Sequence, residues 1–173
     1  HAGADPVDYR LELLAASPRH SNVVRLAAEK SGWGNPAPEG TVRGFAFAES
    51  FNTSVAQVVE IAMDGSTPRV KRAWCAVDCG VAINPINVRA QTEGGLGFGL
   101  GATMAEKLTL TGGVVDQANY DSYTPLRIDA MPRVEVHIVP SAEKPTGVGE
   151  PGVPPAGPAL ANAVAAATGR RIR

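Results

Sequence analysis

One carboxylate in this sequence stands where it could act as a catalytic base. Glu150 lies in the run TGVGEPG at residues 146–152, just before an alanine-rich segment. Glycine allows close backbone approach and proline restricts the chain, so such a loop can hold one side chain in a single pose, as a general base requires. Taken alone, however, these residues favour the simpler alternative, an exposed glutamate on a turn.

A second unusual feature is a glycine-rich helix. Asn84 and Pro85 predict its start, as the N-cap and the first helical residue. Each glycine in a helix interior costs about 1 kcal/mol relative to alanine, so something must compensate. The helix either crosses a neighbour at very close range or leaves room for a bulky ligand, and the residues alone leave both open. The glycines concerned are Gly94, Gly95, Gly97, Gly99 and Gly101.

Familiar nucleotide and metal motifs do not fit. The glycines recur every second residue, which is not the spacing of a dinucleotide-binding loop, and no Gly-Lys-Ser/Thr is present. Cys75 and Cys79 are the only cysteines, too few for a four-thiolate iron–sulfur cluster or a paired-ligand zinc site. We assign no metal-ligating residue to this chain.

Composition indicates a folded protein of one domain or two small ones. The 173 residues are 44% hydrophobic and 19% charged. A net charge of −1 argues against nucleic-acid binding, which usually requires a basic surface. No apolar run approaches the roughly 20 residues of a membrane helix. Because the chain starts at His1 without an initiator Met, we expect a piece of a longer polypeptide.

The patterning predicts an α+β fold with a mixed, largely antiparallel sheet and helices packed on one face. We divide the chain into a helical hairpin and linker (1–36) and a subdomain (37–173). Phe45, Phe47 and Phe51 are expected on one strand face, and His137 is expected to face solvent. The expected elements are a helical hairpin at 6–31, consecutive antiparallel strands from 43, at 55–61 and at 70–77, a short hairpin at 106–116, a strand at 134–138, and helices from 84 and at 158–168.

Three ordered motifs resemble the molybdopterin-binding large subunit of the xanthine oxidase family. They are AVDCGVAINP at 76–85, RAQTEGG at 89–95 and GVGEPGVPP at 147–155. The runs RGFAFAES at 43–50 and ANAVAAATGR at 161–170 also fit. The similarity is to the C-terminal part of that subunit, in the branch of isoquinoline 1-oxidoreductase and the membrane-associated aldehyde dehydrogenases.

This resemblance implies roles for six residues. Glu150 matches the catalytic glutamate, which takes a proton from the oxygen nucleophile at the metal. Gln91 matches a glutamine that contacts the pterin, which gives the glycine-rich helix a ligand to make room for. The remaining expected cofactor-binding positions are Gly94, Gly95, Gly147 and Gly149.

The resemblance also implies cofactors and partners. The cofactor would be molybdopterin, in the cytosine dinucleotide form that bacterial relatives tend to use, with [2Fe-2S] clusters on a small partner subunit or another domain. The other partners are the upstream part of the same large subunit and a small substrate, an N-heteroaromatic or an aldehyde, oxidised with water as oxygen source. The chain alone is expected to be inactive. Export of such relatives favours the periplasm or the membrane. Two alternatives stay open: a non-catalytic assembly module, and a small-ligand binding domain without molybdenum chemistry.

Overall fold

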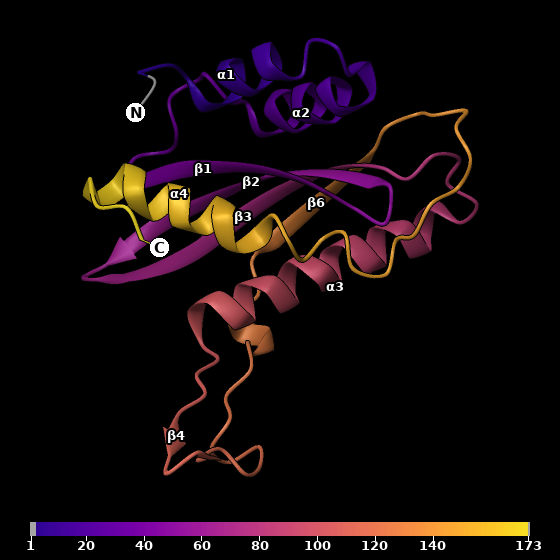
Figure 1. Ribbon diagram of the computed structural model, residues 1–173. Helices are drawn as coiled ribbons and strands as arrows, with labels where there is room; N and C mark the ends of the chain where they lie inside the picture. Colours follow the sequence, from indigo (N-terminus) through magenta and orange to yellow (C-terminus); the bar gives the residue numbers. More distant parts are fainter. Residues whose placement is uncertain (1–2, 173) are drawn as a thin grey trace.

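A four-stranded sheet forms the middle layer of the protein (Figure 1). The computed structural model describes residues 3–172. The strands are β1 (Thr41–Ser50), β2 (Thr53–Asp64), β3 (Thr67–Asp78) and β6 (Arg133–Ile138), in the order β1-β2-β3-β6. The first three are antiparallel, and β6 runs parallel to β3. The predicted mixed, largely antiparallel sheet is therefore confirmed.

Two tight turns connect the antiparallel strands. Gly65, with φ at 60°, supplies the left-handed conformation that the turn between β2 and β3 needs. Between β1 and β2 the turn consists of Phe51 and Asn52, whose φ angles are 53° and 57°. Phe51 therefore leaves the strand and is 60% exposed. The prediction that it shares a strand face with Phe45 and Phe47 is wrong, because the period-two pattern runs on past the end of β1.

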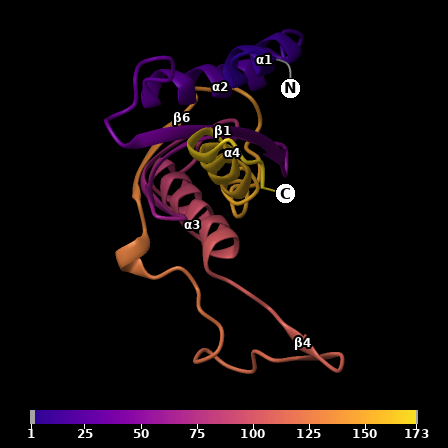
Figure 2. The same ribbon diagram turned by 90° about the vertical axis from the view of Figure 1, so that its left-hand side faces the viewer.

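Helices cover both faces of the sheet (Figure 2). The helices α3 (Pro85–Met104) and α4 (Ala156–Thr168) pack on one face, as expected. The hairpin of α1 (Pro6–Leu13) and α2 (Pro18–Ser31) covers the opposite face through Val23, Val24 and Ala27. The division of the chain at residue 36 stays a prediction.

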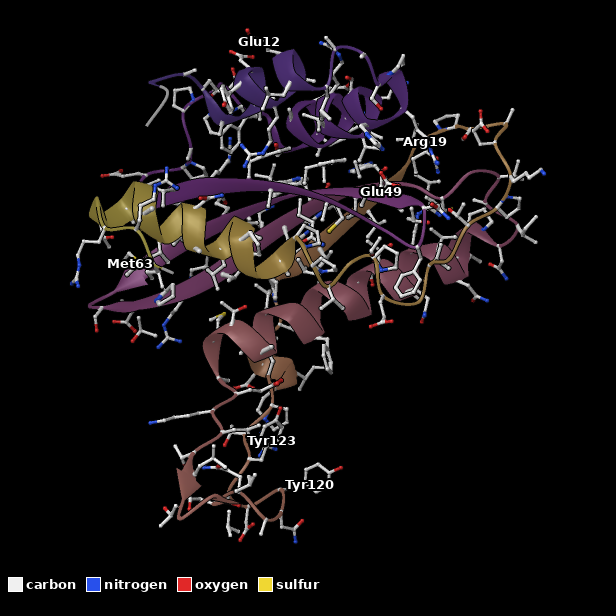
Figure 3. The ribbon with its side chains drawn as sticks, in the orientation of Figure 1. Glu12, Arg19, Glu49, Met63, Tyr120 and Tyr123 are labelled. Carbon is white, nitrogen blue, oxygen red and sulfur yellow. The ribbon has the colours of Figure 1, made fainter. Side chains whose placement is uncertain are left out.

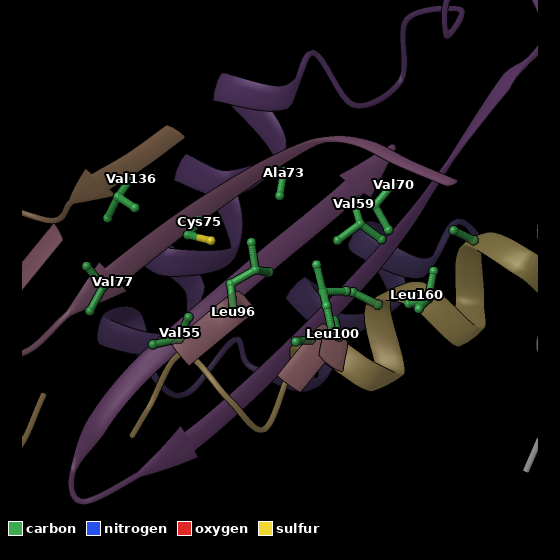
Figure 4. Packing of buried hydrophobic residues seen from close by; sticks show 14 of the residues in the cluster. Val55, Val59, Val70, Ala73, Cys75, Val77, Leu96, Leu100, Val136 and Leu160 are labelled. Carbon is green, nitrogen blue, oxygen red and sulfur yellow. The ribbon is translucent and has the colours of Figure 1, made fainter. Parts of the chain in front are cut away.

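The central strand β2 is buried on both faces. Val55 and Val59 pack toward α3 and α4, while Val58 packs toward α2. This double burial explains why the strand reads as a nearly continuous apolar run. Figure 4 shows the α3 side of the core, which contains Val55, Val59 and Cys75 from the strands, Leu96 and Leu100 from α3, and Leu160 from α4.

Helix α4 crosses β1 at Gly44. A methyl group on Gly44 would lie 2.1 Å from the carbonyl oxygen of Ala159 and 2.3 Å from the backbone nitrogen of Ala163. The helix can reach this distance only because residue 44 has no side chain. Asn162 strengthens the crossing, since its Nδ2 donates a 3.0 Å hydrogen bond to the carbonyl of Phe45.

An extension between α3 and β6 points away from the sheet (Figures 1 and 2). It contains the short strands β4 (Leu110–Thr111) and β5 (Val114–Val115) and the 3-10 turn η1 (Ile128–Ala130). The predicted hairpin is confirmed, although its strands are shorter than expected. Tyr120 and Tyr123 lie on this extension (Figure 3).

His137 differs from its predicted position. It was expected to face solvent, yet it is only partly exposed and its Nε2 is buried without a partner among residues 3–172. It occupies the sheet face covered by α2, opposite Ala76 of β3, because β6 pairs in parallel with β3. Within the described part of the chain, no helix is both long and apolar enough to span a membrane.

Candidate functional site

The loop that carries Glu150 first runs along the turn that follows β3. The backbone N–H of Val81 donates to the carbonyl of Glu143 (3.0 Å), and that of Thr146 donates to the carbonyl of Cys79 (2.9 Å). Gly80 lies between them with φ at 71°, and a methyl group there would lie 2.1 Å from the carbonyl oxygen of Lys144. Glycine is required at this position for both its conformation and its lack of a side chain.

An ion pair with a buried carboxylate holds this turn in place. Asp78, at the end of β3, is 2% exposed, and its Oδ2 lies 3.1 Å from Nε of Arg19 on α2. Its Oδ1 accepts a 2.9 Å hydrogen bond from the backbone N–H of Gly80. The helical hairpin on one face of the sheet is thus connected to the turn along which the loop runs.

At its other end the loop packs against α3. A methyl group on Gly152 would lie 2.7 Å from the carbonyl oxygen of Thr92, and one on Gly95 would lie 3.0 Å from Cα of Gly152. Nε2 of Gln57 on β2 donates a 2.8 Å hydrogen bond to the carbonyl of Gly152. A turn follows Glu150, whose carbonyl accepts from the N–H of Val153 at 2.8 Å.

This path brings Gln91 and the Glu150 loop together. A methyl group on Gly149 would lie 4.0 Å from Nε2 of Gln91, and Glu150 is the next residue. Gln91, Gly149 and Glu150 are all exposed, so they meet at the surface of this chain. Among residues 3–172, no side chain forms a hydrogen bond or ion pair with the Glu150 carboxylate. The carboxylate is thus available to a ligand.

The predicted cofactor-binding glycines divide into open and packed positions. A side chain at Gly94 would meet nothing within 4 Å, and one at Gly149 would meet only Gln91. Gly95 is packed against Gly152, and a methyl group on Gly147 would lie 3.0 Å from Cβ of Phe51. The positive φ of Phe51 is a strained conformation, of the kind that clusters at functional sites.

The close-crossing explanation of the glycine-rich helix is confirmed at some of its glycines, and room for a ligand stays a prediction at the others. Gly95 and Gly99 allow the start of α4 and the segment before it to cross α3 at close range, since a methyl group on Gly99 would lie 2.7 Å from Cβ of Ala156. Gly94 instead leaves a bare backbone on the surface, three residues from Gln91. A role for Gly94 or Gly95 in cofactor binding stays a prediction.

These residues offer the hydrogen-bonding groups and the open backbone that binding a pterin requires. The exposed amide of Gln91 can both donate and accept hydrogen bonds. The backbone N–H groups of Gly147 and Gly149 donate no hydrogen bond within residues 3–172. At Gly94 an added methyl group would meet nothing within 4 Å, so a ligand can approach the backbone there. The site residues therefore fit a cofactor rich in ring nitrogens and oxygens.

Sequence reasoning missed the residues that hold the loop. Thr53, Gln57 and Asp78 are buried polar side chains on the sheet, and each contacts the loop or the turn beside it. The signal available in the sequence was a glutamine inside the otherwise apolar run VAQVV, since buried polar residues usually have specific partners.

Comparison with known proteins places the chain in a family. A family described as a molybdopterin cofactor-binding domain matches residues 9–132. Isoquinoline 1-oxidoreductase subunit beta of Brevundimonas diminuta is 39% identical, over 98% of this chain and 22% of its own length. A membrane-bound aldehyde dehydrogenase (pyrroloquinoline-quinone) of Gluconacetobacter polyoxogenes is 34% identical, over 98% and 25%. The chain thus spans about a quarter of the length of these relatives.

Solved structures share the fold. Quinoline 2-oxidoreductase from Pseudomonas putida 86 matches with a TM-score of 0.60 and 23% identity, over 69% of this chain and 16% of that one. The aldehyde oxidoreductase of Desulfovibrio gigas matches with a TM-score of 0.59 and 23% identity, over 69% and 14%. The resemblance carried by the three motifs is confirmed: this chain belongs to the molybdopterin cofactor-binding domain family, and is related to the molybdenum-binding subunits of the xanthine oxidase family.

Proposed function

We propose that this chain forms one half of the active site of a molybdenum hydroxylase, with Glu150 as the general base. The observation that carries the proposal is the position of Gln91 beside Gly149, directly next to Glu150. A pterin ligand and a catalytic carboxylate must lie together in such an enzyme. Two motifs separated by more than fifty residues meet here as that function requires.

The net reaction converts a C–H bond and water into a C–OH bond, two protons and two electrons. The molybdenum centre, when bound, supplies the two-electron redox chemistry. Gln91 would bind and orient the pterin through its amide, and the Glu150 carboxylate would take the proton from the water-derived oxygen nucleophile. A base positioned in this way typically contributes a factor of about 10²–10⁴ to the rate.

The finer assignments belong to the same proposal. The substrate is an N-heteroaromatic compound or an aldehyde, and the names of the relatives support both classes. The electrons leave through [2Fe-2S] clusters on a partner subunit or another domain, and the pterin is the cytosine dinucleotide form. The Gluconacetobacter relative is named for pyrroloquinoline quinone, but the matching family is described by molybdopterin, which is the cofactor that we propose.

The test is Glu150→Gln in the full-length parent enzyme. We expect kcat to fall at least a hundredfold while molybdenum and pterin content stay at the wild-type level, because the amide cannot accept the proton. Glu143→Gln, an exposed glutamate earlier in the same loop, is the matched control and should retain wild-type turnover. Retained turnover in Glu150→Gln would remove Glu150 as the base.

Two alternatives have distinct outcomes. A non-catalytic assembly module predicts a parent protein without turnover that still binds its partner subunit. A small-ligand binding domain predicts a purified parent without molybdenum. We further propose that the 173-residue chain alone is inactive, because it spans only about a quarter of its relatives. Near-stoichiometric molybdenum in the purified chain would contradict this.

A further inference from the structure

Two buried polar side chains of β2 point to the loop that carries Glu150. Thr53 and Gln57 are both 0% exposed and lie four residues apart, on the same face of the strand. Oγ1 of Thr53 lies 2.6 Å from Oγ1 of Thr146, and Nε2 of Gln57 donates to the carbonyl of Gly152 at 2.8 Å. Between these two contacts, Val55 and Val148 belong to the same apolar core.

The part of the loop from Thr146 to Gly152 contacts β2 at both of its ends. Four residues of a strand cover about 13 Å, whereas the six steps from residue 146 to residue 152 could extend over about 20 Å. This part of the loop is therefore longer than the distance that it bridges, so the contacts at its two ends restrict the positions that its middle part can take. Glu150 lies in that middle part.

A glutamine at the fully buried position 57 costs stability, so we expect its hydrogen bond to Gly152 to serve a purpose. A buried amide without its hydrogen bonds destabilises a folded protein, and Oε1 of Gln57 has no partner among the described residues. β2 is also a rigid strand from which to hold the loop, because it is paired on both sides and buried on both faces. Side chains that fix a catalytic group work best from such rigid elements.

We propose that Thr53 and Gln57 are positioning residues for Glu150, which hold the two ends of the loop through hydrogen bonds from the central strand. This inference rests on the proposed function of Glu150. Neither side chain contacts the reacting atoms, so both act only through the loop. Their removal should reduce the rate of the chemical step and leave substrate binding largely unchanged.

The experiment uses the full-length parent enzyme with Thr53→Val and Gln57→Leu, which keep the size of each side chain and remove its hydrogen bond. We expect kcat to fall at least tenfold in each variant, with KM within twofold of wild type and unchanged molybdenum content. Thr53→Ser keeps the hydroxyl and should restore kcat. Ser54→Ala is the matched control, because Ser54 is equally buried, points to the opposite face and has no hydrogen-bond partner among the described residues.

A double-mutant cycle separates this inference from the proposed function. If Thr53 and Gln57 act through Glu150, Thr53→Val and Gln57→Leu should change the residual rate of Glu150→Gln by less than twofold. Wild-type kcat in both variants, together with a collapse in Glu150→Gln, would overturn the positioning role alone. Full activity in Glu150→Gln would overturn the proposed function instead. If Gln57→Leu does not fold, the comparison of Thr53→Val with Thr53→Ser decides the outcome.

Discussion

Gly95 of α3 and Gly152 of the Glu150 loop meet backbone to backbone, since a methyl group added to Gly95 would lie only 3.0 Å from Cα of Gly152. This contact brings the end of the loop against the helix that carries Gln91. The two motifs can lie side by side because neither residue has a side chain. The same helix leaves Gly94 uncovered, and the difference between these glycines is open to experiment.

Gly152→Ala and Gly94→Ala should change stability in opposite directions. The methyl group on Gly152 would lie 2.7 Å from the carbonyl of Thr92, so we expect a loss of about 1–3 kcal/mol in the free energy of unfolding. At Gly94 nothing lies within 4 Å, and alanine should stabilise the helix by about 1 kcal/mol. Denaturant unfolding measures both. If Gly94 faces the pterin, Gly94→Ala should also lower the pterin content of the parent enzyme.

Arg19→Met should destabilise the protein by on the order of 3 kcal/mol, because it leaves the Asp78 carboxylate buried without its cation. The matched control is Arg69→Met, which removes the exposed ion pair between Arg69 and Asp64. Exposed pairs of this kind contribute about 0–1 kcal/mol. Urea unfolding measures both losses. Equal losses in the two variants would show that the ion pair between Arg19 and Asp78 contributes no more to the free energy of unfolding than an exposed pair does.

His137 should make the protein less stable at acid pH. Burial, and to a smaller extent the nearby Lys30, lowers the pKa of His137 below its usual value. The folded state therefore favours the neutral ring, and protonation favours the unfolded state. This contribution is fully present above about pH 6.5 and is lost as the pH falls through the lowered pKa of the folded state. His137→Gln should flatten the decline in melting temperature between pH 7 and pH 5. An unchanged slope would contradict the assignment.

The buried thiol of Cys75 should not react in the folded protein. Burial raises its pKa to about 12, with a smaller contribution from Glu93, and the side chain is 0% exposed. Since the thiolate is the reactive form, a thiol reagent at pH 8 should modify Cys75 only after unfolding. Cys79, 2% exposed and with its pKa also raised mainly by burial, should behave in the same way. Rapid native-state labelling of either cysteine would show that the core opens.

Much of the fold follows from signals within a few residues of one another. Asn84 accepts a hydrogen bond from the N–H of Asn87, and Pro85 follows it as the first residue of α3, as the sequence indicated. Gly169 ends α4 in the left-handed conformation, and Gly65 closes the hairpin between β2 and β3. Each of these signals depends on local backbone geometry, which the residue type constrains directly.

Where a local pattern was wrong, a tertiary contact or the end of an element was the reason. Phe51 continues the alternation of β1, but the chain turns there so that Ser50 and Thr53 can pair. His137 alternates correctly with its neighbours, yet both faces of the sheet are covered, so the side expected to face solvent lies on the sheet face that α2 covers. Alternation identifies the faces of a strand and does not reveal what covers them.

The sequence by itself determined the element types, the family and the identity of the candidate site residues, because caps, turns, alternation and short motifs are local properties of the chain. Only the tertiary structure decided that Gln91 lies beside Gly149, that Gly95 packs on Gly152 and that Gln57 holds the carbonyl of Gly152. These contacts join residues far apart in the sequence. They depend on how the layers pack, and only the folded chain specifies that packing.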